Sequence, residues 1–249
     1  MGEVMQIYPG DPLKTLASVN GYYECPKDES GRRLGPLVGY AGTYKDESGI
    51  KRQKVGEIYC NFAKADNYPR MLDQFARDLQ LNGYIGGTIQ AFCGAPLGGY
   101  SFSTVLGLVY DIPVIKAEKK VVALATQGSR EMTDLVFARD QVEPGVNYAI
   151  VEDVCNNFST VEKLVPLIFD AGASVSQIIC LLNRSALVDD YYQMKNMNLS
   201  IAVNNLVRIK MRDFRQDDPY VREDIEVGNV VWKPKDDWGR LEKAMAEVA

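Results

Sequence analysis

Hydrophobic residues recur at helical spacing along much of the chain. Leu72, Phe75, Ala76 and Leu79 lie at i, i+3, i+4 and i+7, which predicts a helix that ends near Gly83. The same spacing predicts further helices over residues 100–109, 159–171 and 241–248. Short apolar runs between them predict strands at residues 88–93, 112–115, 121–124, 148–151, 176–182 and 206–211. Strands that alternate with helices predict an α/β fold with a mainly parallel, twisted sheet of five to six strands flanked by helices.

The first 65 residues lack this alternation. They contain two similar polar stretches, Lys27–Gly31 and Lys45–Gly49, which predict turns between short strands. We therefore expect a small β-rich hood lobe from residues 1–65 together with part of the C-terminal tail. The α/β core then covers residues 66–210, and residues 211–249 form an extension that ends in a helix.

Composition narrows the chemistry. The net charge is −5 and no basic stripe stands out, which disfavours a nucleic-acid-binding protein. Neither an apolar run of about 18 residues nor a basic start before an apolar run is present, so neither a membrane span nor a signal peptide is predicted. Five scattered cysteines favour reduced thiols and a cytoplasmic location. The absence of histidine excludes Ser-His and Cys-His catalysis.

The clearest candidate site is the segment Tyr148–Thr160, YAIVEDVCNNFST. Its apolar strand delivers Glu152 and Asp153 to the carboxyl end of the strand, the edge where open α/β sheets bind ligands. Ser159 and Glu162 form an S-x-x-E capping box, which predicts a helix start able to hold a phosphate. A sugar phosphate with Mg²⁺ suits both features, since the carboxylates can meet hydroxyls or the cation. The alternative is an exposed acidic pair before an ordinary turn.

This segment resembles the ribose-phosphate motif of the type I phosphoribosyltransferases. Other segments are similar to orotate phosphoribosyltransferase in the same order along residues 50–185. They are Ile50-Lys51, Ile58–Asn61, the Gly-rich turn Cys93–Gly99, the polar stretch Lys116–Asp140 and Asn183-Arg184. The polar stretch occupies the place of the family's mobile catalytic loop. Ala95-Pro96, in the Gly-rich turn, is a candidate cis peptide.

The resemblance implies transfer of a 5-phosphoribosyl group from phosphoribosyl pyrophosphate to a pyrimidine base, with orotate first, and release of pyrophosphate. It implies Mg²⁺ held mainly by substrate, with Asp153 as a candidate protein ligand, and a homodimer. The catalytic residues implied are Lys116, Lys120, Glu152 and Asp153, and the 5-phosphate site adds Asn156, Asn157, Phe158, Ser159 and Thr160. Pyrophosphate would meet Ala95, Pro96, Leu97, Gly98, Gly99, Lys119 and Arg130. The base would meet Lys51, Tyr59, Cys60, Asn61 and Arg184.

Two departures keep alternatives open. Asn156, Asn157 and Phe158 stand where the family has threonines and a glycine, and the expected mobile loop lacks the family's histidine. The ring of Phe158 either tucks into the sheet edge or fills the phosphate site. The same chemistry on another base, such as adenine or uracil, is one rival reading. A non-catalytic sensor of a nucleotide or of phosphoribosyl pyrophosphate is the other.

Overall fold

The computed structural model describes residues 5–83, 85–86, 88–123 and 132–247. The chain forms two compact units: residues 1–64 with 210–249, and residues 65–209. Arg130 and the expected element ends Leu124 and Val248 lie outside the described residues. No helix among the described residues is long and apolar enough to cross a membrane.

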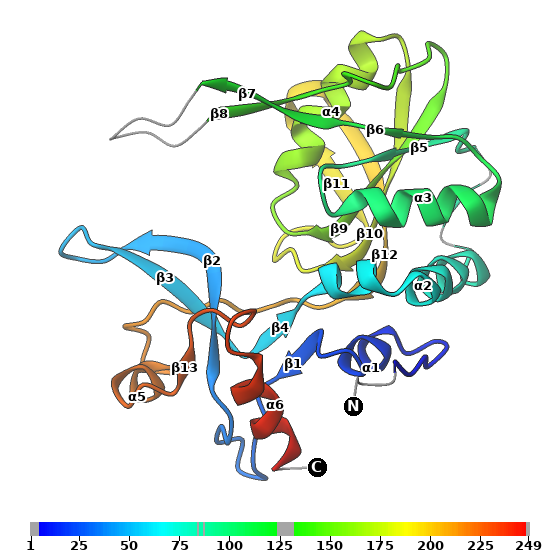
Figure 1. Ribbon diagram of the computed structural model, residues 1–249. Helices are drawn as coiled ribbons and strands as arrows, with labels where there is room; N and C mark the ends of the chain where they lie inside the picture. Colours follow the sequence, from blue (N-terminus) through cyan, green and yellow to red (C-terminus); the bar gives the residue numbers. More distant parts are fainter. Residues whose placement is uncertain (1–4, 84, 87, 124–131, 248–249) are drawn as a thin grey trace. The chain divides into compact units, whose positions relative to one another are not determined.

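The unit of residues 65–209 is built on a six-stranded sheet (Figure 1). Its strands, in spatial order, are β11 (Tyr191–Met194), β12 (Leu199–Arg208), β10 (Ser174–Asn183), β9 (Asn147–Cys155), β5 (Ala91–Gly94) and β6 (Val114–Lys116). Every neighbouring pair is parallel except β11 with β12. The predicted mainly parallel α/β sheet is confirmed.

Helices cover both faces of this sheet (Figure 1). They are α2 (Pro69–Leu81), α3 (Gly99–Tyr110) and α4 (Ser159–Asp170). Tyr148 and Ile150 of β9 pack in one cluster with Leu164 of α4. Ala149 and Val151 alternate with them on the opposite face and are also fully buried. A strand covered on both sides explains the continuous apolar run that the sequence shows at this position.

Several elements differ in extent from their predicted ranges. β9 continues four residues past Val151 to Cys155, so Glu152 and Asp153 lie within the strand and not after it. β12 begins at Leu199, well before the predicted start at Leu206, because Ile201 and Val203 alternate inward into the core. An antiparallel hairpin, β7 (Glu118–Ala123) with β8 (Met132–Val136), occupies much of the stretch that was expected to be a loop.

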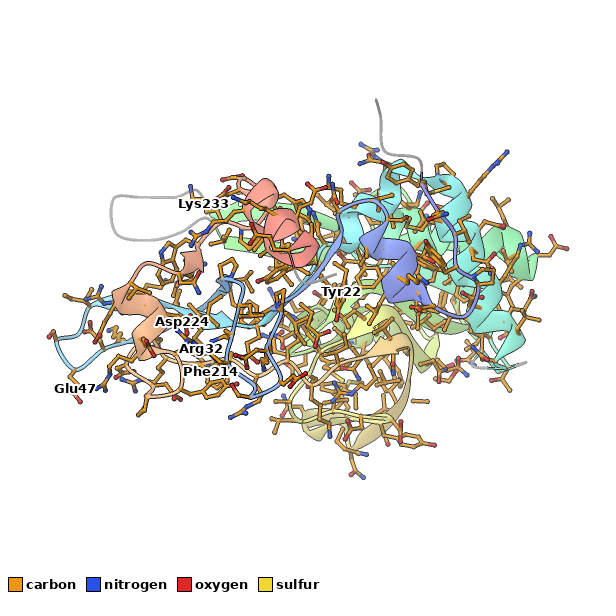
Figure 2. All side chains as sticks on the ribbon, turned by 90° about the horizontal axis from the view of Figure 1, so that it is seen from below. Tyr22, Arg32, Glu47, Phe214, Asp224 and Lys233 are labelled. Atoms are coloured by element: carbon orange, nitrogen blue, oxygen red, sulfur yellow. The ribbon has the colours of Figure 1, made fainter. Side chains whose placement is uncertain are left out.

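The other unit contains two small sheets. β1 (Tyr22–Glu24) pairs with β4 (Ile58–Cys60), and β2 (Leu37–Lys45) lies between β3 (Lys51–Gly56) and β13 (Val230–Val231). Its helices are α1 (Pro12–Ala17), α5 (Arg222–Glu226) and α6 (Trp238–Ala246). The 3-10 turn η1 (Phe62–Asn67) crosses the boundary between the two units, and the 3-10 turn η2 (Lys195–Met197) belongs to the unit of residues 65–209. Glu47 lies on the turn that ends the β2–β3 hairpin (Figure 2). The segment 210–249 contributes β13 and α6 to this unit.

Candidate active site

Strand register brings the predicted core residues to one edge of the sheet. Gly94 at the end of β5 is aligned with Val151 of β9 and with Lys116 of β6. Asn183 at the end of β10 is aligned with Cys155 and Arg208. Because these strands are parallel, the connections that follow β5, β9 and β10 leave from the same edge. The Gly-rich turn, the acidic doublet and Arg184 therefore share it.

The Gly-rich turn lies directly against β9. The amide of Ala95 donates to the carbonyl of Val151 at 2.9 Å. A Cβ on Gly99 would lie 2.0 Å from that same carbonyl oxygen, and one on Gly98 would lie 2.2 Å from the carboxyl carbon of Asp153. Glycine is thus required at both positions for the turn and the acidic doublet to touch. The cis peptide joins Pro96 and Leu97, so its expected position at Ala95-Pro96 is wrong.

Glu152 and Asp153 have different environments. The side chain of Glu152 is buried, with 8% of the residue exposed, and its carboxylate is hydrogen-bonded by the Thr160 hydroxyl. The pKa of Glu152 is raised to about 7, mainly by burial and also by the neighbouring charge of Asp153, while the Thr160 hydrogen bond opposes the rise. Asp153 is half-buried, and its carboxylate accepts the Val154 amide at 2.9 Å. One group is shielded while its neighbour stays within reach of solvent.

The predicted helix start is confirmed, but its predicted cap is wrong. α4 begins at Ser159, and Phe158 is the residue before it, with φ +57°. The Ser159 amide is bonded by the side-chain oxygen of Asn157 at 3.2 Å. The carboxylate of Glu162 accepts the hydroxyl of Tyr192 at 2.6 Å, which takes the place of the capping-box bond. A tertiary partner has outcompeted the local one.

The turn at the start of α4 keeps features that suit an anion. Asn156, Asn157 and Ser159 are exposed, while the ring of Phe158 is buried and stacked on Tyr192. The first N–H groups of a helix have no partner within it, and the helix dipole places positive charge there. Because the Phe158 ring lies in the core cluster, it does not cover these N–H groups from the solvent side.

The predicted lysines lie on two different strands, Lys116 on β6 and both Lys119 and Lys120 on β7. Lys116 ends β6; its amide donates to Asp140 at 2.6 Å, and its ammonium lies 5.8 Å from the centre of the Tyr100 ring. Lys119 and Lys120 are both exposed on β7, and as consecutive strand residues they point to opposite faces. The charge of Lys119 is the one that reaches Glu152 and lowers its pKa.

The expected base-binding residues fall in both units. Tyr59 and Cys60 lie on β4, with the Tyr59 ring 6.2 Å from that of Trp238 in a small core. The Asn61 amide donates to the Gly21 carbonyl at 2.7 Å. Lys51 is exposed at the start of β3, whose length separates it from β4 by roughly 17 Å of extended chain. Within this unit the structure does not bring Lys51 together with Tyr59.

Arg184 begins the connection after β10, which a network of side chains orders. Its amide donates to the carbonyl of Cys155 at 2.9 Å, and the residue is half-buried. The guanidinium of Arg208 donates to the Asn183 carbonyl at 3.0 Å and to the Asp189 carboxylate at 2.7 Å. Arg208 was not predicted; its position at the end of a parallel strand is the signal that could have revealed it.

Asp66 is a second residue that sequence reasoning missed. Burial raises the pKa of its carboxyl group, a side-chain hydrogen bond with Ser101 lowers it, and the charge of Asp153 raises it. Asp66 thus lies within electrostatic reach of the acidic doublet, although 87 positions separate the numbers 66 and 153. No local pattern links these residues, because the contact that holds Asp66 here is a tertiary one, its hydrogen bond with Ser101 of α3.

Comparison with known proteins shows what this chain is similar to. No family model matches it. It is 26% identical over 131 residues to the orotate phosphoribosyltransferase of Methanosarcina mazei, a match that covers 53% of this chain and 65% of that protein, less than two thirds of its length. The sequence match is thus to a phosphoribosyltransferase, the kind of protein that the motif of residues 148–160 resembles.

Two solved structures of phosphoribosyltransferases are similar to this chain. The orotate phosphoribosyltransferase of Aeropyrum pernix is 15% identical with a TM-score of 0.46, over 76% of this chain and 93% of that one. The adenine phosphoribosyltransferase of Rhodothermus marinus is 17% identical with a TM-score of 0.49, over 80% and 98%.

Proposed function

We propose that this chain transfers a 5-phosphoribosyl group from phosphoribosyl pyrophosphate to a nucleobase, with orotate as the first candidate, and releases pyrophosphate. One observation carries the proposal: a single sheet edge holds the glycine turn, the acidic doublet and the start of α4. These parts suit pyrophosphate, ribose hydroxyls and a 5-phosphate, respectively. The sequence match to an orotate phosphoribosyltransferase supports it.

The roles follow from the chemistry of each group. Glu152 and Asp153 accept hydrogen bonds from the ribose diol. The backbone amides of residues 156–160 and the exposed side chains of Asn156, Asn157 and Ser159 hold the 5-phosphate. Lys116, Lys119 and Lys120 offset the charge of the departing pyrophosphate. A reaction with a cation-like ribose and a dianionic leaving group gains most from positioning and charge stabilisation, which these residues supply.

Mg²⁺ fits this arrangement as a substrate-borne ion. Among the described residues no group of three or more cysteine, aspartate or glutamate side chains could hold a metal. Asp153 offers hard oxygen donors beside Gly98, and Mg²⁺ is commonly bound by one or two carboxylates together with phosphate oxygens. Asp153 would hold it, and the ion would neutralise pyrophosphate charge.

A panel of bases tests the proposal. The protein is incubated with phosphoribosyl pyrophosphate and Mg²⁺ together with orotate, uracil, adenine or no base, and pyrophosphate release is measured. Release that depends on one base supports the transferase and identifies its substrate. Phosphoribosyl pyrophosphate that binds without release under every base would instead favour a non-catalytic sensor.

Arg184→Ala tests orotate as the base. Arg184 follows β10 at the site edge, where a guanidinium can meet the carboxylate of orotate. We expect the orotate KM to rise more than the KM for phosphoribosyl pyrophosphate. The reason is that the variant loses a charged hydrogen bond to orotate, which contributes about 1.5–3 kcal/mol to binding. Steady-state kinetics with each substrate varied measure this, and equal changes in both constants would contradict the role.

The sensor remains the second candidate, since the chain has no histidine and carries Phe158 in the turn. The buried position of the Phe158 ring favours the enzyme, because the ring packs against Tyr192. A crystal soaked in phosphate tests this. An anion bound by the amides of residues 156–160 is expected, and a Phe158 ring found in the anion's place would contradict the proposal.

A further inference from the structure

Phe158 has an unusual backbone conformation for its residue type. Its φ is +57°, in the left-handed region, which costs a non-glycine residue about 1–2 kcal/mol. Its side chain is 4% exposed and stacks on the ring of Tyr192, with centroids 4.7 Å apart and planes inclined by 12°. Burial of an aromatic ring offsets such a backbone cost, so this conformation depends on Tyr192.

Glu162 contacts both residues of the stack, so Phe158, Tyr192 and Glu162 form a three-residue cluster. Its carboxylate accepts the Tyr192 hydroxyl at 2.6 Å, and its backbone amide donates to the Phe158 carbonyl at 2.9 Å. The three residues come from the turn, from α4 and from the edge strand β11. The turn that opens α4 is thereby attached to an edge strand of the unit's sheet.

A cavity lies beside the cluster of Phe158, Glu162 and Tyr192. A cavity of about 860 Å³ is lined by Phe158, Glu162 and Tyr192, and also by Asn156 and Asn157 of the turn. Neighbouring side chains therefore do not enclose the turn on that side. The stack and its hydrogen bond supply the restraint that close packing would otherwise provide.

We propose that the Phe158–Tyr192 stack is a positioning device that holds residues 156–160 in the conformation that binds the 5-phosphate. The inference rests on the proposed function, because that function assigns this turn to phosphate. Phe158 and Tyr192 act through the backbone of the turn and do not touch the substrate. The chain thus orders by side-chain packing a turn that a glycine would make by backbone freedom.

Tyr192→Leu tests the device, with Tyr191→Leu as its matched control. Tyr191 is the preceding residue of β11, is 62% exposed and points to the other face of the strand. We expect Tyr192→Leu to raise the KM for phosphoribosyl pyrophosphate about tenfold, with little change in the KM for the base. Tyr191→Leu should leave both constants unchanged, and Tyr192→Phe, which keeps the ring, should recover most of the affinity.

Hydrogen exchange of the backbone amides of residues 157–163 gives a readout independent of turnover. It should accelerate in Tyr192→Leu and in Phe158→Gly, although glycine adopts the positive φ freely. Folded Tyr192→Leu with unchanged exchange and unchanged affinity would overturn the positioning role alone. A wild-type protein that binds no phosphoribosyl pyrophosphate would overturn the proposed function and, with it, the phosphate assignment of the turn.

Discussion

Glu152 is a buried carboxyl group whose ordinary pKa is 4.5 and whose folded-state pKa is about 7. The folded protein therefore binds more protons than the unfolded chain between these values. The stability that this group contributes is fully present below pH 4.5 and is lost as the pH rises through about 7. Above that pH the charged carboxylate remains buried, supported by Thr160 and opposed by Asp153.

Glu152→Gln removes this dependence on pH. The amide oxygen can still accept the Thr160 hydroxyl, but no charge is buried. The free energy of unfolding of the variant, relative to wild type, should rise by roughly 2–3 kcal/mol between about pH 5 and about pH 8. Denaturant unfolding at both pH values measures it. Exposed Glu29→Gln is the control and should show no such trend.

Asp153→Asn addresses the neighbouring carboxylate. Asp153 is half-buried beside Gly98, and the proposed function assigns it to the ribose hydroxyls or the substrate's Mg²⁺. Calorimetric titration with phosphoribosyl pyrophosphate and Mg²⁺ should show weaker binding, with a nearly unchanged melting temperature. Wild-type affinity in this variant would remove Asp153 from the site.

At the scale of elements, the start of α3 is set by its contact with β9. Gly98 precedes the helix and Gly99 opens it, and both lie against backbone or side-chain atoms of β9. The nearest atom to an added Cβ at Gly99 is the Val151 carbonyl oxygen, which also accepts the Ala95 amide. That oxygen cannot move without breaking the attachment of the glycine turn.

Gly99→Ala should therefore destabilise the protein. We expect a loss of about 2–3 kcal/mol, the upper range for overpacking, measured by denaturant unfolding. Gly239→Ala in α6 is the matched control: it is also in a first helical turn, and nothing lies within 4 Å of its added Cβ. It should be neutral or stabilise by up to about 1 kcal/mol through helix propensity. Equal losses at both positions would contradict the contact.

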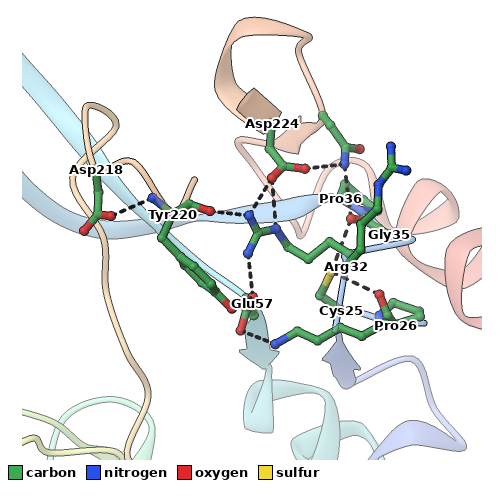
Figure 3. Close-up of polar contacts among 12 residues, drawn as sticks. Cys25, Pro26, Arg32, Gly35, Pro36, Glu57, Asp218, Tyr220 and Asp224 are labelled. Atoms are coloured by element: carbon green, nitrogen blue, oxygen red, sulfur yellow. Dashed lines mark hydrogen bonds and ion pairs between the residues drawn. The ribbon is translucent and has the colours of Figure 1, made fainter. Parts of the chain in front are cut away.

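At the scale of the whole molecule, the guanidinium of Arg33 connects the N-terminal and C-terminal segments that form one unit, residues 1–64 and 210–249. Arg33 donates to Glu57 and to Asp224 at 2.9 Å each, and also to the Tyr220 carbonyl. Figure 3 labels these three partners, Glu57, Tyr220 and Asp224. Its side chain is 11% exposed, and Lys27 binds the other Glu57 oxygen at 2.9 Å. The network connects residues 27–57 with residues 220–224 of the tail.

Arg33→Met keeps the length of the side chain and removes its charge. Glu57 retains Lys27, but Asp224 loses its cation, so we expect a loss of about 2–3 kcal/mol in unfolding free energy. Arg32→Met changes the adjacent, exposed arginine and should have an effect within about 0.5 kcal/mol. If both variants unfold alike, the network does not stabilise the unit.

Local patterns predicted much of this structure and the tertiary contacts corrected it. The 3.6-residue spacing from Leu72 to Leu79 predicted α2, and Gly83 follows its end with φ +66°. Both Lys-Asp-Glu-Ser-Gly stretches form turns, in which Asp28 and Asp46 accept amides two residues on. The extension of β9 through Asp153 was not predictable, because pairing with β10 and not residue preference continues that strand.

The sequence by itself determined the alternation of strands and helices, the position of the acidic doublet and the start of α4, since these depend on periodicity and on residues near each other in the chain. Only the tertiary structure decided that Glu162 binds Tyr192 and not the helix cap, and that Asp66 and Arg208 join the site edge. It also decided the position of the Phe158 ring. These outcomes depend on partners many residues away, and a local pattern carries no information about which distant side chain will compete for the same group.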